Sequence, residues 1–355
     1  EYGKRLGEAL FKDEVRDEFA AAVREGSDKN PLRVLLYIED EELKSLRWEK
    51  LCTPKENKSW FFLRLDPCVT FSIYVPSPID SSLFPPISKF DLRALVLVAS
   101  PKNTPGLDHF EVQKTVDRVQ KALQGIPCDV LANLDNSDDR NAPTLPNLLE
   151  KLQNEKYTLL HIVCHGIVTK NKTDTMLYWA NADSKLERVL GTTLIRELKE
   201  RGYKLPHFTF LCACETASRE EKGALGGLAG RLVRELGMPA VVAMTDRVEV
   251  NTAMTMTEQF YKHLVSSGEV DFALAKAVPV RHDTSDIIVP ALFSRLGGLP
   301  LFSNSLEKEL NDQDISRGLK RLLEVNQEPE NEMPNDLEDE SKNLTSDNSK
   351  SSEKK

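Results

Sequence analysis

The chain has 355 residues, a net charge of −9 at neutral pH, 40% hydrophobic residues and 29% charged residues. This length allows about two domains, and the composition is typical of a globular protein with a sizeable core. The negative balance argues against a nucleic-acid surface, because phosphate binding requires clustered lysine and arginine. No apolar stretch is long enough to span a membrane and the first residues lack a signal-peptide pattern, so we expect a cytoplasmic protein without direct nucleic-acid or membrane contact.

Residues 1–88 are expected to form an N-terminal α+β subdomain. An apolar stripe at helical spacing predicts a helix from Tyr2 to Arg24. Apolar and β-branched runs predict strands over residues 33–38, 61–65 and 69–75. Several prolines between positions 76 and 86 then interrupt regular structure, and we place the subdomain boundary there.

Strand and helix patterns alternate through residues 89–303, the expected core. Repeated βα units predict a doubly wound, mostly parallel sheet between two layers of helices, which is an α/β fold. Strands are predicted at 93–99, 128–131, 157–166, 207–214 and 240–245, with a hairpin arm at 175–180 and a last strand within 290–302. Helices are predicted at 108–123, 143–153, 192–199, 223–236, 251–264 and 270–278.

The end of the chain has a different character. Leucines at helical spacing within 304–326 are typical of an amphipathic helix. Residues 327–355 are acidic and rich in serine and asparagine, so they cannot bury enough apolar surface to fold. We expect this tail to be disordered.

Two of the predicted strands end in reactive side chains. The run from Tyr157 to Gly166 ends in His165 and Gly166, and the run from His207 ends in Cys214. Open α/β sheets place their chemistry at the carboxyl ends of the strands. If these two strands are neighbours, an imidazole and a thiol lie at the same edge of the sheet. A cysteine nucleophile needs at least such a thiol and a nearby base.

These strand ends carry a family resemblance. His165-Gly166 and the later run Ala213–Thr216, which reads Ala-Cys-Glu-Thr, resemble the CHAT family of caspase-like cysteine peptidases, with a more distant similarity to separase. The run Trp48–Leu51 is similar to the family's Trp-Glu-X-Leu motif, and Phe260–Leu264 to its Phe-Tyr-X-X-Leu helix. The resemblance implies a caspase-like three-layer sandwich and cysteine endopeptidase activity. Because Glu215 replaces the arginine that follows the caspase cysteine, cleavage after aspartate is not implied.

The resemblance also assigns roles at this edge. Cys214 would be the nucleophile and His165 the general base and acid, which a thiol needs because its ordinary pKa of about 8.5 leaves it mostly protonated. The backbone N–H groups of Gly166 and Cys214 would hold the oxyanion. Cys212 is the rival nucleophile, but it lies on the same strand face roughly 6 to 7 Å deeper, so the outermost cysteine is favoured.

Two acidic residues are expected to bind substrate, Asp246 and Glu215. The stretch around Asp246 resembles the separase segment whose aspartate receives an arginine side chain, and a carboxylate would pair bidentately with it. The alternatives for Asp246 are a cap on the helix near Asn251 or an ion pair with Arg247.

We expect no metal or other cofactor. A zinc set of Cys164, His165, Cys212 and Cys214 fails because adjacent residues of a strand point to opposite faces. By resemblance, the substrate is a protein, and a sensor domain, repeat domain, partner protein or ligand switches the activity in prokaryotic signalling or antiviral defence.

Two other functions remain open at this stage. A catalytically inactive caspase-like scaffold could keep the fold for binding, although it would not need the Cys-His pair. A nucleotide-binding or receiver-like domain would require a phosphate-binding glycine loop after its first strand, and Ser100–Gly106 is a poor match.

Overall fold

A computed structural model describes residues 1–55, 59–107, 109–123, 125–135, 138–171, 174–200, 204–213, 224–246, 248, 250–278 and 289–303. Residues Glu1–Ser305 form one compact unit. The predicted helix within 304–326 and the predicted tail 327–355 lie outside the described residues. No helix of the described part is long and apolar enough to cross a bilayer.

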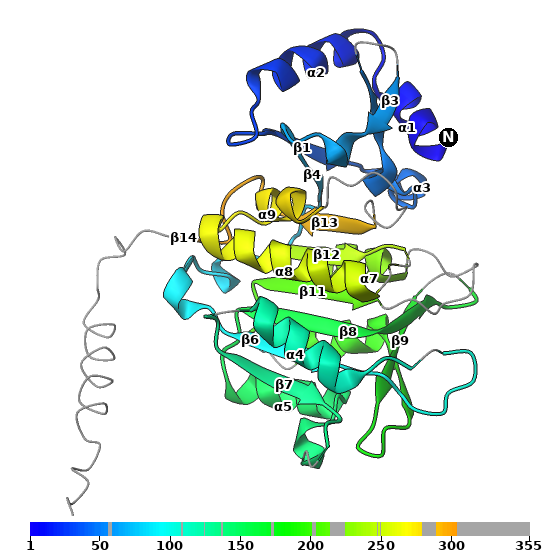
Figure 1. Ribbon diagram of the computed structural model, residues 1–355, viewed down its shortest axis with the longest axis vertical. Helices are drawn as coiled ribbons and strands as arrows, with labels where there is room; N and C mark the ends of the chain where they lie inside the picture. Colours follow the sequence, from blue (N-terminus) through cyan, green and yellow to red (C-terminus); the bar gives the residue numbers. More distant parts are fainter. Residues whose placement is uncertain are drawn as a thin grey trace, which may run out of the picture. The chain divides into compact units, whose positions relative to one another are not determined.

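A twisted, mostly parallel sheet forms the centre of the unit (Figure 1). Its path runs β1-β4-β13-β12-β11-β8-β6-β7, and only the β12–β13 pair along this path is antiparallel. A hairpin of β9 and β10 extends from β8. The strands are β1 (Leu32–Tyr37), β4 (Val69–Tyr74), β6 (Ala94–Val98), β7 (Cys128–Ala132), β8 (Leu159–Val168), β9 (Thr175–Ala180), β10 (Leu186–Leu190), β11 (Phe208–Ala213), β12 (Ala240–Met244) and β13 (Pro290–Ser294).

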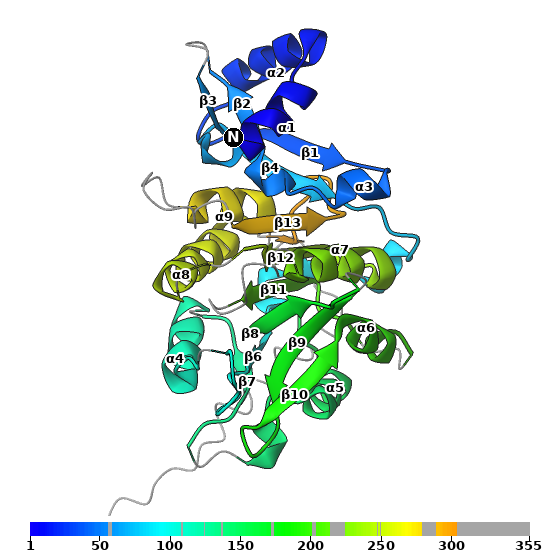
Figure 2. The same cartoon turned by 90° about the vertical axis from the view of Figure 1, so that its right-hand side faces the viewer.

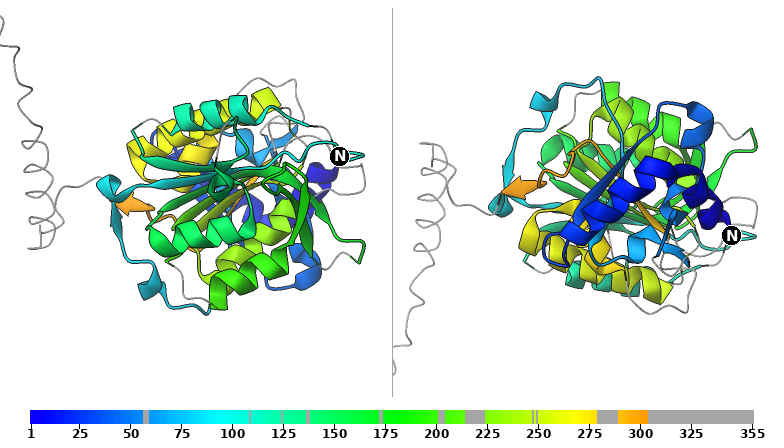
Figure 3. Two further views of the ribbon diagram at one scale, coloured as in Figure 1. Left: turned by 90° about the horizontal axis from the view of Figure 1, so that it is seen from below. Right: turned by 90° about the horizontal axis from the view of Figure 1, so that it is seen from above.

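Helices cover both faces of this sheet, as Figures 2 and 3 show. On one face lie α4 (Val112–Ala122), α8 (Val250–Ser267) and α9 (Val270–Ala277), and on the other α5 (Leu145–Asn154), α6 (Gly191–Glu200) and α7 (Ala224–Leu236). Every residue of β6 and β12 is buried, as expected for continuous apolar strands between two helix layers. The predicted α/β sandwich, with a mostly parallel central sheet between two layers of helices, is therefore confirmed.

The N-terminal part adds strands to the same sheet. β4 pairs in parallel with β13, and β1 pairs with β4, so residues before 88 extend the sheet beyond the alternating core. This part also has an apolar cluster of its own around α1 (Tyr2–Leu10) and α2 (Asp13–Glu25). Short elements complete it: α3 (Glu41–Lys44), η1 (Trp48–Lys50), β2 (Cys52–Pro54), β3 (Trp60–Phe62) and η2 (Leu63–Leu65). The boundary at residue 88 stays a prediction.

Three sequence predictions of elements were wrong in detail. The single helix from Tyr2 to Arg24 is two helices, because the chain turns at Phe11 and enters α2 at Asp13 with a φ of 47°. The strand predicted at 61–65 ends early and continues as η2. The last strand is split into β13 and β14 (Phe302–Ser303), and β14 pairs with β5 (Ile87–Ser88). The labels η1 to η5 denote short 3₁₀ helices, and the remaining ones are η3 (Ser81–Leu83), η4 (Lys89–Asp91) and η5 (Asp139–Asn141).

Candidate active site

The strands β8 and β11 lie side by side and run parallel. Their register pairs Cys212 with Val163 and Ala213 with Cys164. His165 is the next residue of β8 after Cys164. The predicted neighbourhood of these two strand ends is thus present in the structure.

The candidate base, His165, is buried, with 3% of its surface exposed. Its ring lies against Phe110, with ring centroids 5.4 Å apart, and Phe110 belongs to the apolar core on the α4 and α8 side of the sheet. Cys164 belongs to the core on the opposite side, as strand alternation requires. These positions place the imidazole on the same face as Cys212, which is fully buried in the α4 and α8 side.

The candidate nucleophile Cys214 and the candidate substrate residue Glu215 lie outside the described residues. Their roles remain predictions. The structure describes β11 as far as Ala213, the residue that precedes Cys214 in the sequence.

Gly166 is held between two elements. It pairs with Leu177 of β9, and a Cβ atom added to it would lie 3.2 Å from Leu225 Cδ2 of α7 and 3.5 Å from Leu177 Cδ2. The absence of a side chain therefore lets α7 pack closely over this part of β8. This packing is one reason for a glycine here, and the predicted oxyanion role of its N–H is a separate, untested one.

Asp246 is engaged by the N-terminal part of the chain. Its Oδ2 atom lies 2.9 Å from Arg47 Nη1 and 3.2 Å from Lys50 Nζ, and 14% of its side chain is exposed. Neither predicted alternative, the helix cap nor the ion pair with Arg247, included these two partners. The predicted role in substrate binding stays a prediction. A substrate arginine would compete with Arg47 and Lys50 for the carboxylate.

The neighbouring Thr245 ties the same segment to the end of β12. Its hydroxyl oxygen lies 2.8 Å from Glu49 Oε1 and 2.7 Å from the carbonyl oxygen of Val289, and these two acceptors share its one proton. Glu49 is 4% exposed and also pairs with Arg47, whose Nε lies 2.9 Å from Glu49 Oε1. The Trp48–Leu51 motif thus anchors the N-terminal part beside the carboxyl end of the sheet.

Two other histidines are structural. His161 is fully buried, its Nδ1 lies 2.9 Å from the Tyr261 hydroxyl, and burial lowers its pKa to about 3. His207 lies just before β11, where its Nε2 is 2.9 Å from the carbonyl oxygen of Pro85 and burial lowers its pKa. Both lie toward the amino ends of their strands.

Sequence reasoning missed a serine at the same edge as His165. Ser100, two residues after β6, accepts a hydrogen bond from the N–H of Phe110 at 3.0 Å, and its hydroxyl lies 2.8 Å from Nδ1 of His109. Because Phe110 contacts His165, Ser100 fixes one wall of the histidine's surroundings. Only its position after a buried strand marked it in the sequence.

No group of three His, Cys, Asp or Glu side chains in the described part comes together as a metal site. The zinc set considered from sequence would need Cys164 and His165, which face opposite sides of the sheet.

The layers and the strand order define an α/β sandwich. Its candidate site lies where His165 follows the buried part of β8, beside the carboxyl end of β11. The chain belongs to the CHAT domain family, whose sequence profile matches residues 1–286. The family resemblance carried by His165-Gly166 and the Ala-Cys-Glu-Thr run is thereby confirmed.

Two solved structures of gingipain are similar to this chain. One is the Arg-specific cysteine proteinase gingipain R, with 13% identity, a TM-score of 0.48, and coverage of 83% of this chain and 70% of that one. The other is the complex of the pro- and mature domains of RgpB from Porphyromonas gingivalis, with 15% identity, a TM-score of 0.47, and coverage of 84% and 72%. No curated protein matches the chain.

Proposed function

We propose that this protein is a cysteine endopeptidase that cleaves a protein substrate with His165 and Cys214. The observation that carries the proposal is the parallel pairing of β8 with β11, in which Ala213 lies opposite Cys164. One peptide bond joins Cys214 to Ala213 and one joins His165 to Cys164. This pairing supports the proposal, because the residues that directly precede Cys214 and His165 in the chain lie opposite each other in two adjacent strands.

The proposed chemistry follows from these groups. His165 removes the proton of the Cys214 thiol, and the thiolate attacks the carbonyl carbon of the scissile peptide bond. The N–H groups of Gly166 and Cys214 stabilise the oxygen that becomes negatively charged. The imidazolium then protonates the leaving amine, and His165 deprotonates the water that hydrolyses the acyl-enzyme.

Asp246 and Glu215 are the proposed substrate-binding residues, with a preference for arginine before the cleaved bond. In support of this, Asp246 already binds a guanidinium, that of Arg47, through Oδ2. An incoming arginine would have to displace Arg47 and Lys50 or share the carboxylate with them.

The resemblance supplies the wider setting of the proposal. We infer a cytoplasmic enzyme of a prokaryotic signalling or antiviral defence system, with activity switched by a sensor domain, a repeat domain, a partner protein or a ligand. The buried contact between Glu49 and Thr245 supports this regulation, because it could transmit a change in the N-terminal part to the end of β12.

The test is covalent labelling, measured by intact mass. Peptidyl electrophiles with Arg, Leu, Met or Asp next to the reactive group are added to the wild type, Cys214→Ala and the matched control Cys212→Ala. We expect one adduct on the wild type and on Cys212→Ala, and none on Cys214→Ala. Adducts that persist in Cys214→Ala, or a wild type that no reagent labels, would favour the inactive scaffold.

A further inference from the structure

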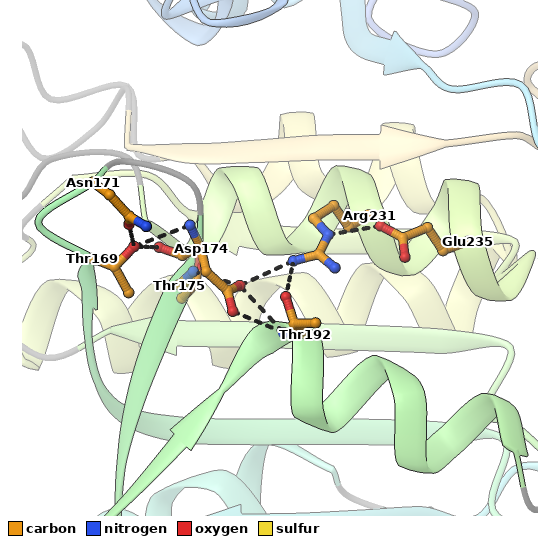
Figure 4. A network of polar contacts seen from close by, with 7 residues as sticks. All are labelled: Thr169, Asn171, Asp174, Thr175, Thr192, Arg231 and Glu235. Atoms are coloured by element: carbon orange, nitrogen blue, oxygen red, sulfur yellow. Dashed lines mark hydrogen bonds and ion pairs between the residues drawn. The ribbon is translucent and has the colours of Figure 1, made fainter.

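A carboxylate at the start of β9 joins three elements, the β8–β9 hairpin, α6 and α7 (Figure 4). Asp174 directly precedes β9, and its side chain is 12% exposed. Its Oδ1 atom accepts from the N–H of Thr175 at 2.8 Å, and both carboxylate oxygens lie 3.2 Å from the N–H of Thr192 in the first turn of α6. The carboxylate therefore caps a helix that begins far from it in the sequence.

The third element is α7, through Arg231. Arg231 Nη1 lies 3.0 Å from Asp174 Oδ1 and 3.2 Å from Thr192 Oγ1, and its Nε donates to Glu235 Oε1 at 2.7 Å. The guanidinium is thereby held in one orientation between two carboxylates. An arginine that is partly buried and held by several hydrogen bonds keeps a better-defined orientation than an arginine in an exposed ion pair.

The local sequence makes room for this junction. Gly191 begins α6, and a Cβ atom there would lie 3.0 Å from Asp174 Oδ1 and 3.1 Å from Leu228 Cδ1. On its other side the hairpin is closed by Thr169, whose hydroxyl oxygen accepts from the Asp174 N–H at 3.1 Å. The same oxygen lies 2.6 Å from Asn171 Oδ1 and 3.1 Å from the Asp174 carbonyl oxygen, which share its one proton. Asp174 is thus fixed from both its backbone and its side chain.

This junction reaches the histidine side of the candidate site. Three residues beyond Asp174, Leu177 pairs with Gly166, the neighbour of His165. On the other side, α7 is the first described element after β11, so it follows Cys214 in the chain, and its Leu225 packs on the Gly166 backbone. A shift of α7 relative to the hairpin would therefore move the Gly166 backbone and, with it, the adjacent His165.

We propose that Asp174 and Arg231 are positioning residues for the peptidase reaction. By locking α7 to the β8–β9 hairpin, they hold Gly166 and the adjacent His165 in place. The proposal rests on the proposed function, and the experiment below separates the two.

The experiment measures how fast iodoacetamide alkylates Cys214 at pH 6, with each cysteine followed separately by peptide mass spectrometry. Only a thiol activated by a nearby imidazole reacts readily at this pH. The full chain is compared with Asp174→Asn, Arg231→Gln and the double variant. Asparagine keeps an oxygen that can accept from Thr175 and Thr192, so the hairpin and α6 retain their caps. The matched control is Arg140→Gln, which removes an exposed ion pair with Asp138.

We expect each single variant to slow alkylation of Cys214 by about tenfold or more, because misplacing reacting groups by about 1 Å can cost about a hundredfold in rate. The double variant should be no slower than the slower single variant, since both substitutions remove one coupling. Alkylation of the partly exposed Cys68 and Cys128 should not change, nor should Arg140→Gln differ from the wild type.

The outcomes separate two failures. If the wild type alkylates Cys214 no faster than an ordinary thiol, the proposed dyad is wrong and the positioning role falls with it. If the wild type is activated and Asp174→Asn and Arg231→Gln retain the full rate, the dyad stands and the positioning role is wrong. A thermal melt of each variant shows whether it is folded at the assay temperature, and only folded variants are compared for their alkylation rates. A loss of rate restored by Arg231→Lys would support the role of the charge.

Discussion

The central strands β6 and β12 differ from the outer strands β1 and β4 in how they are attached to the rest of the protein. Every residue of β6 is fully buried between helices, and β12 is nearly so. The outer strands are attached by the pairing of β4 with β13 and by polar contacts. One of these is the carboxylate of Asp271 in α9, which accepts from the Thr70 hydroxyl at 2.9 Å and pairs with Arg33 at 3.2 Å.

This difference separates two kinds of stability. Apolar packing is non-directional and spread over many contacts, so its loss at one site weakens the whole core. A buried ion pair is directional, and losing one partner leaves a charge without compensation. Loss of a few polar contacts should therefore unfold the N-terminal part locally, whereas the central core should unfold cooperatively.

The largest effect is expected in the central core. Phe260 of α8 is fully buried and its ring centroid lies 5.3 Å from those of Phe208 and Phe210. Phe260→Ala should lower the free energy of unfolding by about 4 kcal/mol, because large cavities in cores cost this much. Urea unfolding followed by circular dichroism measures the change. Phe90→Ala, at a ring that is 78% exposed, is the control and should change stability little.

A smaller and more local effect is expected at the outer strands. Asp271→Ala removes the shared partner of Arg33 and Thr70 and should cost about 1 to 2 kcal/mol, because the buried Thr70 hydroxyl loses its acceptor while Arg33 keeps its ion pair with Glu269 at 2.8 Å. Hydrogen exchange should show lost protection in β1 and β4 while β6 and β12 stay protected. Equal loss in all four strands would contradict the distinction between the two regions.

The pH dependence of stability tests the buried histidine of the centre. Because burial lowers the pKa of His161 to about 3, the unfolded chain binds more protons than the folded protein between that pH and about 6.5. His161 therefore favours folding fully above about pH 6.5, and this contribution falls by about 1.4 kcal/mol for each pH unit below it. Urea midpoints at pH 7, 6 and 5 should fall more steeply for the wild type than for His161→Gln, and parallel slopes would contradict the assignment.

The smallest effect is a gain in stability at a buried arginine of the N-terminal part. Arg64 is 6% exposed, its Nε and Nη1 atoms have no hydrogen-bond partner among the described residues, and burial lowers its pKa to about 10. Arg64→Met removes a poorly compensated charge and should stabilise the protein by about 1 kcal/mol. A thermal melt detects the shift, with Arg140→Met as the exposed control. A destabilised Arg64→Met would show that the charge contributes to folding.

The central strands and the candidate histidine could be predicted from the sequence because their signals are local. Continuous apolar runs mark β6, β8 and β12, and His165-Gly166 follows directly from the run that forms β8. The parallel neighbourhood of β8 and β11 followed from the alternation of strands and helices.

The remaining features depend on contacts between distant residues. Asp246 meets Arg47 across 199 positions of the chain, and Arg231 meets Asp174 across 57, so no local pattern indicates either pair. The pairing of β4 with β13 is also set by tertiary packing. The same limit explains why the break between α1 and α2 was missed, since Phe11 fits the apolar stripe of one long helix while its ring packs on Phe19 of the next, with centroids 4.7 Å apart.

The most direct test of the central claim is the pH profile of Cys214 alkylation by iodoacetamide from pH 5 to 10, in the wild type and in His165→Gln. A thiol paired with His165 should react well below its ordinary pKa of about 8.5, and His165→Gln should return the profile to that of an ordinary thiol. Two coinciding profiles would show that His165 does not activate Cys214, and the peptidase proposal would then be wrong.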